Sequence, residues 1–177
     1  MKVNIGNYPS WNRFTNWIGY EPKQKIKVQI ERWDTYSMDQ TLSHIIHPML
    51  IQLRDTSHGI PWVDQKDVPK TLRWTKAEAV AYEKHGDMDD NFGPRWEWII
   101  NEMIWAFGQK ITDDDNTFGE GNWDVSWTDT GKGDGTSEMK YGPDHTYKID
   151  KDALTNHHDR MRKGFLFFGK YYEHLWD

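Results

Sequence analysis

Residues 150–177 read DKDALTNHHDRMRKGFLFFGKYYEHLWD, and this stretch decides the fold. Its apolar side chains recur at spacings of three and four residues, which places them along one face of a helix. The stripe consists of Leu154, His158, Met161, Phe165, Phe168, Tyr172 and Leu175. Asp150 is suited to cap the first turn, and the basic residues come late, where the helix dipole favours them. We therefore expect a long amphipathic helix that packs against an earlier element.

The expected partner of that helix is RWEWIINEMIWAFGQK, residues 95–110, which directly follows Pro94. Proline is favoured at the first position of a helix. Apolar side chains cover most of its circumference, namely Trp96, Trp98, Ile99, Ile100, Met103, Ile104, Trp105 and Phe107. A helix with so little polar surface is buried on most sides, so we expect it at the centre of the core.

Two further helices precede this one. Residues 37–56 carry a broad apolar face, and Pro48 inside them should kink the helix or remove one of its hydrogen bonds. A shorter helix begins with a capping box formed by Thr75 and Glu78, and Gly86 should end it. The long helices are therefore expected at residues 37–56, 95–110 and 150–177.

Alternation of apolar and polar residues predicts strands at residues 2–5 and 25–31. The same pattern in residues 123–128 and 139–141, separated by TGKGDG, predicts a hairpin. We predict an α+β fold that forms a single domain over residues 1–177. Its three principal helices should pack on a small, mostly antiparallel sheet, with an acidic hairpin projecting.

The composition narrows the possible classes of protein. The chain has a net charge of −6, 11 tryptophans and no cysteine, which excludes disulfides, thiolate zinc sites and cysteine nucleophiles. No apolar run approaches the roughly 20 residues of a membrane span, and the first ten residues lack the apolar core of a signal peptide. The excess of acids argues against unspecific binding to nucleic acids. We expect a soluble protein that acts without a cofactor and away from membranes.

Three segments point to a family. They are DTYSMDQTLSHIIHPMLIQLRDTSHGIPWVDQKDVP at residues 34–69, RWEWIINEMIWAF at residues 95–107 and GFLFFGKYYEHLWD at residues 164–177. Together they resemble an uncharacterised protein family of tailed phages, especially phages from marine samples. The resemblance implies a protein made in the cytoplasm of the infected bacterial host during phage growth or assembly. It brings no established activity, cofactor or catalytic residue, so no catalytic residue is assigned.

Histidines on expected helices are the candidates for metal binding. His44 and His47 are three residues apart, so both could reach one ion from adjacent turns if carboxylates completed the shell. With Glu102 and His158 they suggest one alternative function, a metal-dependent hydrolase of nucleotides or nucleic acid. His158 and Asp159 also form a doublet of the kind found in helical phosphohydrolases. A structural role for these histidines is the simpler interpretation.

A carboxylate on the most apolar helix is the better clue to a buried polar cluster. Glu102 lies between Ile100 and Met103 and should need a partner, such as an arginine, a tyrosine or a histidine. The candidate cluster comprises Asp34, Asp39, His44, Glu102 and His158. We expect it to fix the register of the helices rather than to catalyse a reaction. The acidic runs DMDDN and DTGKGDG lack the full calcium-loop pattern and should form turns.

The predicted function is that of a non-catalytic accessory or interaction protein with an aromatic-rich surface. Trp11, Trp17 and Trp33 are the candidates for that surface. Residues 1–33 are basic, whereas residues 87–124 hold ten acids, and such polarity could steer a protein partner or self-association. A third possibility is binding of single-stranded nucleic acid by stacking, which would need a basic groove around the same tryptophans.

Overall fold

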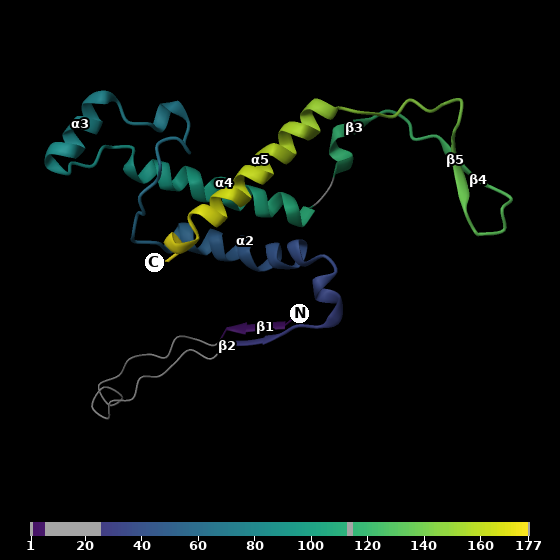
Figure 1. Cartoon of the computed structure of the whole chain (residues 1–177), viewed down its shortest axis with the longest axis horizontal. Coiled ribbons are helices and arrows are strands. Elements are labelled where there is room, and N and C mark those ends of the chain that lie inside the picture. The colour runs from purple at the N-terminus through teal and green to yellow at the C-terminus, as the bar shows by residue number, and fades with distance from the viewer. Residues whose placement is uncertain (1, 6–25, 113–114, 177) are drawn as a thin grey trace. The chain divides into compact units, whose positions relative to one another are not determined.

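The computed structural model in Figure 1 describes residues 2–5, 26–112 and 115–176. Contacts within the chain form two compact units, Met1–Leu42 and Ser43–Asp177, and each is described by itself. The single domain expected over the whole chain stays a prediction. Among the described residues, none of the helices combines the length and the apolar character needed to cross a membrane.

The first unit contains two strands and the start of a helix. β1 (Lys2–Ile5) pairs antiparallel with β2 (Ile26–Gln29), and Val3 lies opposite Val28. A short 3-10 helix, η1 (Arg32–Thr35), follows. The strands expected from the alternating pattern are confirmed. None of the described side chains in this unit is buried, so its apolar residues remain exposed.

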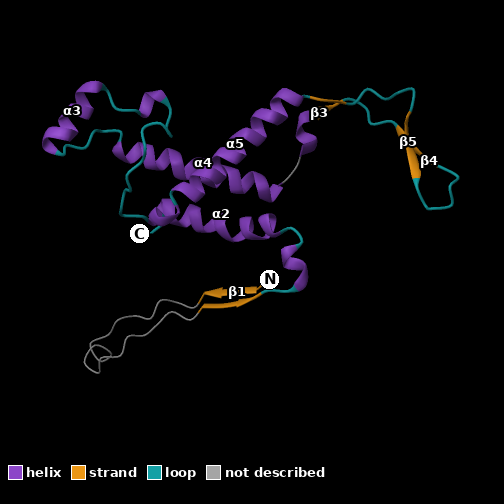
Figure 2. Cartoon of the chain, in the orientation of Figure 1, coloured by secondary structure: helices purple, strands orange, loops and turns teal. Residues whose placement is uncertain are grey.

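Four α-helices dominate the rest of the described chain, and Figure 2 shows them in purple. They are α2 (Met38–Thr56), α3 (Lys76–His85), α4 (Phe92–Thr112) and α5 (Lys151–Lys170). The four expected helices are therefore confirmed, and α2 continues through Pro48. The largest differences from the expected boundaries are at the start of α4 and the end of α5. α4 begins two residues before Pro94, and α5 ends at Lys170, after which 3-10 helix η4 (Tyr172–His174) follows.

The ends of two helices are capped as expected. The Thr75 backbone N–H donates to Glu78 Oε2 over 2.7 Å, and the Glu78 N–H donates back to Thr75 Oγ1 over 3.3 Å. Gly86 ends α3 with φ +72°, a conformation that glycine adopts without strain. At the start of α5, Asp150 Oδ1 accepts a hydrogen bond from the Ala153 N–H over 2.9 Å.

The remaining strands form two further antiparallel ladders. β4 (Val125–Asp129) pairs with β5 (Ser137–Tyr141) to form the expected hairpin, while β3 (Gly119–Glu120) pairs with β6 (Lys148–Ile149). The α+β class is confirmed. One detail of the expected packing is corrected: the described strands form three separate two-stranded ladders rather than one sheet. The core contains no strand residue among those described, because the helices bury their apolar sides against one another.

The core is centred on α4, as expected. Ile99 and Met103 are completely buried, and α2 contributes Leu50 while α5 contributes Phe167 and is followed by buried Tyr171 at its C-cap. Val63 and Val68, from the segment between α2 and α3, complete it. The central expectation of the sequence, that the last long helix packs against the tryptophan-rich one, is confirmed by Trp98 and Phe167, whose ring centroids lie 5.7 Å apart.

The buried face of α5 is rotated from the predicted stripe. Gly164, Phe167 and Tyr171 are buried, whereas Phe165 and Phe168 are only half-buried. The reason is a close helix crossing: a Cβ atom on Gly164 would overlap the Ala106 side chain and lie 2.6 Å from the carbonyl oxygen of Glu102. Because a glycine without a side chain faces α4, the neighbouring positions turn to the flanks of the interface.

Candidate functional site

The five residues of the predicted polar cluster have different settings. Asp34 accepts a hydrogen bond from the Glu31 N–H over 2.7 Å within η1, and Asp39 lies in the first turn of α2. His44 is exposed on α2, and His158 is half-buried on α5 with its ring centroid 5.9 Å from that of His157. The joint cluster stays a prediction. Its fifth member, Glu102, has a well-defined partner.

Glu102 binds an arginine from the neighbouring helix, one of the partners that its position in α4 predicts. Arg160 Nε donates to Glu102 Oε2 over 3.0 Å and Nη2 donates to Oε1 over 2.7 Å, a bidentate pair. The Glu102 side chain is 12% exposed and that of Arg160 is 49% exposed. The hydrogen bond to Glu102 raises the pKa of Arg160, whose Cζ atom lies 3.9 Å from the centre of the Trp105 ring. The pair links α4 to α5.

The proposed metal ligands have different surroundings, and their joint role stays a prediction. His47 lies against α4, where its Nε2 atom would be 3.1 Å from a Cβ on Gly108. Glu102 is engaged with Arg160. Within the described ranges, no group of three or more histidine, aspartate or glutamate side chains is placed to hold a metal ion. The hydrolase alternative therefore gains no support from the geometry of His44, His47, Glu102 and His158.

A buried ion pair that the sequence did not reveal lies beside α4. Arg95 Nη2 contacts Asp89 Oδ2, and only 2% and 4% of the two side chains are exposed. Arg95 Nε also donates to the carbonyl oxygen of Leu72 over 2.7 Å, and Trp74 Nε1 donates to Asp89 Oδ1 over 3.0 Å. Burial favours neutral Asp89, but these hydrogen bonds outweigh it, so its pKa lies below the ordinary value. A turn was expected here.

A cluster of aromatic rings includes Trp74, which contacts this ion pair. The ring centroids of Trp62, Trp74 and Tyr82 lie 5.0 to 5.1 Å from one another, and Phe92 lies 6.2 Å from Trp62. Such spacing is that of packed rings, without room for a ligand between them. This part of the tryptophan content is structural, because it connects α3 to the start of α4.

A second polar cluster joins the end of α5 to the segment after α2. Tyr171 donates its hydroxyl to Asp67 Oδ2 over 2.6 Å and accepts from the Asp64 N–H over 3.1 Å. Lys170 Nζ contacts the same Asp67 oxygen and lies 3.2 Å from Asp64 Oδ2. Hydrogen bonds from Lys66 and Lys170 lower the pKa of Asp64 to about 2. Burial and the bond to Asp67 raise the pKa of Tyr171 to about 12.

Replacing Tyr171 by phenylalanine should lower the free energy of unfolding by about 1 to 3 kcal/mol, because Asp67 and the Asp64 N–H each lose a partner. The tyrosine is protonated in the folded protein up to about pH 12, whereas it ionises near pH 10 in the unfolded chain. Its contribution is therefore complete below pH 10 and is lost as the pH rises towards 12. The difference in the free energy of unfolding between the wild type and Tyr171→Phe, measured by urea unfolding, should be smaller at pH 11 than at pH 8. Exposed Tyr172→Phe is the control, and a constant difference would contradict the assignment.

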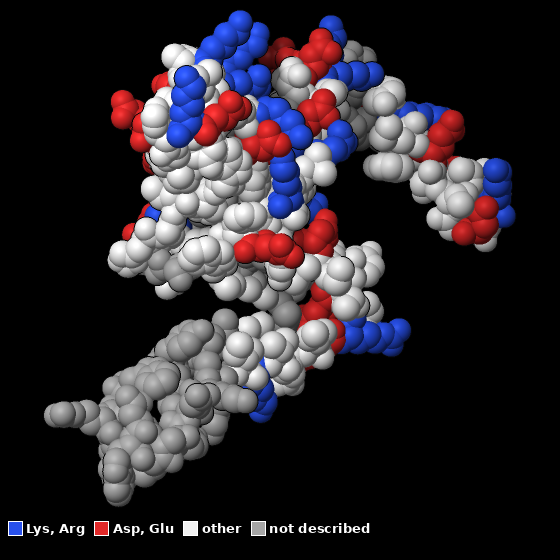
Figure 3. Space-filling model, turned by 60° about the vertical axis from the view of Figure 1, so that its left-hand side comes forward, with Lys and Arg blue, Asp and Glu red and all other residues white. Residues whose placement is uncertain are grey.

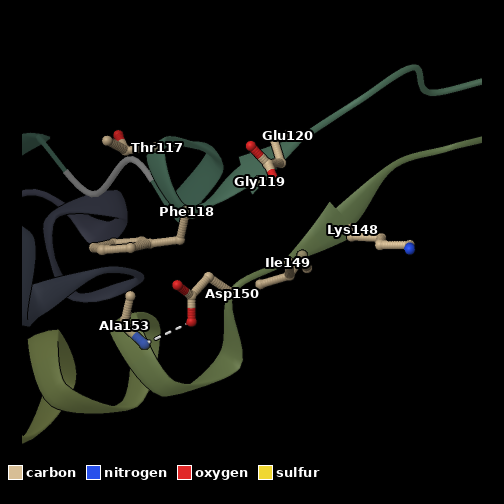
Figure 4. A pocket seen from close by; sticks show the side chains of 8 residues that line it. All are labelled: Thr117, Phe118, Gly119, Glu120, Lys148, Ile149, Asp150 and Ala153. Carbon is tan, nitrogen blue, oxygen red and sulfur yellow. Dashed lines mark hydrogen bonds between the residues drawn. The ribbon is translucent and has the colours of Figure 1, made fainter.

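One small pocket lies at the start of α5, with a volume of about 490 Å³. Figure 4 shows its lining, including the Asp150 carboxylate that caps the helix. The lining residues are Thr117, Phe118, Gly119, Glu120, Lys148, Ile149, Asp150 and Ala153. Glu120 and Asp150 would repel an anion, and Asp150 already accepts from Ala153. The two acids therefore make the pocket a poor site for an anion, although Lys148 also lines it.

The strongest candidate for a binding surface is one face of the β4–β5 ladder. Trp127 lies opposite Met139, and Val125 lies opposite Tyr141, so all four side chains point to the same side. Of these, Trp127 is 67% exposed and Tyr141 is 63% exposed. Exposed Trp123, just before β4, continues the alternation. We call Trp123, Val125, Trp127, Met139 and Tyr141 the aromatic face.

Two rings from the segment after β5 pack against the aromatic face. The His145 ring centroid lies 4.3 Å from that of Tyr141 and 5.4 Å from that of Trp123. Tyr147 also contacts Trp123, with a centroid distance of 5.0 Å. The opposite side of the ladder is polar, since Ser126 lies opposite Lys140 and Thr128 opposite Glu138. The ladder therefore has one polar side and one largely apolar side, which ends in the Asp129–Ser137 pair. On the apolar side Trp123, Trp127 and Tyr141 are exposed, whereas Val125 and Met139 are half-buried.

Of the three tryptophans predicted from the sequence to form a binding surface, the structure describes Trp33. Trp11 and Trp17 are outside the described residues. Trp33, in η1, is exposed, and the Cζ atom of Arg32 lies 5.5 Å from its ring centre. Figure 3 shows basic and acidic side chains interspersed on the visible face of the described chain.

Comparison of the chain with protein-family models, with curated proteins and with solved structures finds no match.

Proposed function

We propose that the chain is a non-catalytic interaction protein that binds another protein through its aromatic face. The observation that carries the proposal is the exposure of Trp127 and Tyr141 on the same side of an isolated two-stranded ladder. A ladder of two strands is only marginally stable in water unless its apolar side packs against something. Tryptophan and tyrosine are also the residues that contribute most to protein interfaces.

The charge of this region favours a protein over a nucleic acid. Residues 123–144 contain five acids and two lysines, a net charge of −3. Binding to phosphates needs clustered basic side chains, which this stretch does not supply. The resemblance of three segments to a tailed-phage family supports a role in the cytoplasm of an infected bacterium. The partner would then be a protein present during phage growth or assembly.

Replacing the aromatic residues should release the partner without unfolding the protein. The full chain, immobilised, is exposed to a lysate of infected bacteria, and a retained protein is purified for titration against variants. Trp127→Ser and Tyr141→Ser should each weaken its binding about tenfold or more, because large aromatic anchors carry much of an interface's energy. Thr128→Ala and Lys140→Ala, on the polar side, should leave it unchanged. Equal affinities for both sets of variants would refute the proposal.

A further inference from the structure

The first unit presents a second apolar strand surface. Val3 lies opposite Val28 in the β1–β2 ladder, so these side chains share a side, and Ile26 and Ile30 follow by alternation. All four are exposed, with Val28 51% exposed. Lys2 and Lys27 belong to the other side, since their register positions alternate with those of Val3 and Val28. We call Val3, Ile26, Val28 and Ile30 the aliphatic face.

We propose that the partner of the aromatic face is the aliphatic face of a second copy of this chain. The inference rests on the proposed function, because it names the partner of the same surface. Each face consists of apolar side chains from one side of a two-stranded antiparallel ladder. Each ladder by itself has fewer strands than an independently stable sheet needs. Stacking one on the other gives a four-strand sandwich with both apolar sides covered.

The two ladders match in size. The strands of β1–β2 have four residues each and those of β4–β5 have five. At about 3.3 Å per residue they are about 13 and 17 Å long, so neither face extends far beyond the other. Stacked sheets lie about 10 Å apart, and large rings facing small branched side chains can fill that space. The three aromatic rings and the aliphatic side chains have these complementary sizes.

Charge favours the pairing of unlike ladders. The β1–β2 ladder carries Lys2 and Lys27 and no acid, whereas the β4–β5 ladder carries Asp129 and Glu138 against Lys140, a net charge of −1. Two aliphatic faces from separate copies would bring basic ladders together, and two aromatic faces would bring acidic regions together. Opposite charges steer unlike ladders towards each other over about a Debye length. Each copy carries both faces, and a reciprocal exchange of faces between two copies would give a closed dimer.

Cysteine crosslinking tests which faces meet, because the natural chain contains no cysteine. Ile26→Cys places a thiol on the aliphatic face, and Ser137→Cys places one at the rim of the aromatic face, where Ser137 pairs with Asp129. The matched controls are Lys27→Cys and Glu138→Cys, one residue away and on the polar sides. Full-length single-cysteine chains, one carrying a mass tag, are mixed in pairs and treated with a short bismaleimide.

Mixing Ile26→Cys with Ser137→Cys chains should give mixed crosslinked dimers at a rate at least about tenfold above any mixture that contains a polar-side control. Sedimentation of the untreated wild type should show a dimer that dissociates on dilution. A predominance of crosslinks between two Ile26→Cys chains, or between two Ser137→Cys chains, would overturn the inference. A chain carrying both cysteines that crosslinks only within itself would also overturn it.

The same set of variants separates this inference from the proposed function. If no mixed crosslink forms and the chain sediments as a monomer, while Trp127→Ser still releases a protein retained from the lysate, the inference fails and the proposed function stands. If Trp127→Ser changes neither self-association nor retention of any protein, both fail. If the mixed crosslink forms and Trp127→Ser reduces it about tenfold or more, both are supported.

Discussion

Asp89→Ala is expected to lower the free energy of unfolding by about 3 to 5 kcal/mol, because it leaves the guanidinium of Arg95 buried without its counter-charge. The substitution also removes the acceptor of the Trp74 indole N–H. Urea unfolding followed by far-ultraviolet circular dichroism measures the change. Asp90→Ala, at the exposed neighbouring position, should alter stability by less than about 0.5 kcal/mol.

Two further measurements identify the ion pair as the cause. The double variant Asp89→Leu, Arg95→Met should be more stable than Asp89→Ala, since it removes both charges together. Because the pKa of Asp89 is lowered in the folded protein, its contribution is complete above its ordinary pKa near 3.8 and is lost as the pH falls further. Wild-type stability should therefore fall more steeply than that of Asp89→Ala below pH 4. Parallel pH dependences would show that the pair contributes nothing as an ion pair.

Gly164→Ala is expected to lower the free energy of unfolding by about 1 to 3 kcal/mol. Alanine favours helix over glycine by about 1 kcal/mol, so any net loss must come from packing. The added methyl group would meet the side chain of Ala106 and the carbonyl oxygen of Glu102, both fixed by α4, so the helices would have to separate. The loss should be largest for a β-branched residue such as Gly164→Val.

Gly169→Ala is the matched control, because Gly169 lies on the same helix and a Cβ there would meet nothing within 4 Å. It should stabilise the protein by about 0.5 to 1 kcal/mol through helix propensity alone. The two glycine-to-alanine changes are thus expected to have opposite signs in urea unfolding. If both variants are more stable than the wild type, the inference that α4 and α5 are in close contact at Gly164 is wrong.

Local signals in the sequence predicted the helices well. Thr75 and Glu78 form the expected capping box, Gly86 ends α3, and Asp150 caps α5. Each of these depends on residues within one turn, so tertiary contacts had little influence on them. The β4–β5 hairpin was also predicted from local signals, because the alternating residues and the glycine-rich turn are adjacent in the chain.

Features that depend on contacts between distant segments were missed. Periodicity places apolar side chains on a face, but Gly164 has none and still lies at the centre of the buried side of α5. Asp89 was expected to lie in a turn, because no pattern in the sequence indicates that Arg95 and Trp74 will both contact it. Arginine at the start of an otherwise apolar helix was the available signal for a buried ion pair.

The candidate surface illustrates the same distinction. Alternation correctly placed Val125 and Trp127 on one side of a strand. Exposure depends on whether another element covers that side, and the sequence pattern is identical in both cases. Trp11, Trp17 and Trp33 were chosen for the density of tryptophans in the sequence instead. Tryptophan content alone does not separate Trp74, which packs beside a buried ion pair, from Trp127, which faces solvent.

The crossing of α5 over α4 at Gly164 also constrains how relatives of this protein can diverge. A larger residue at position 164 would need both a smaller one at position 106 and a shift of the α4 backbone, and Ala106 can lose only one methyl group. Descendants of a common ancestor should therefore retain small residues at these two positions while the surface changes freely. That paired signature offers a way to recognise distant homologues whose overall similarity has been erased.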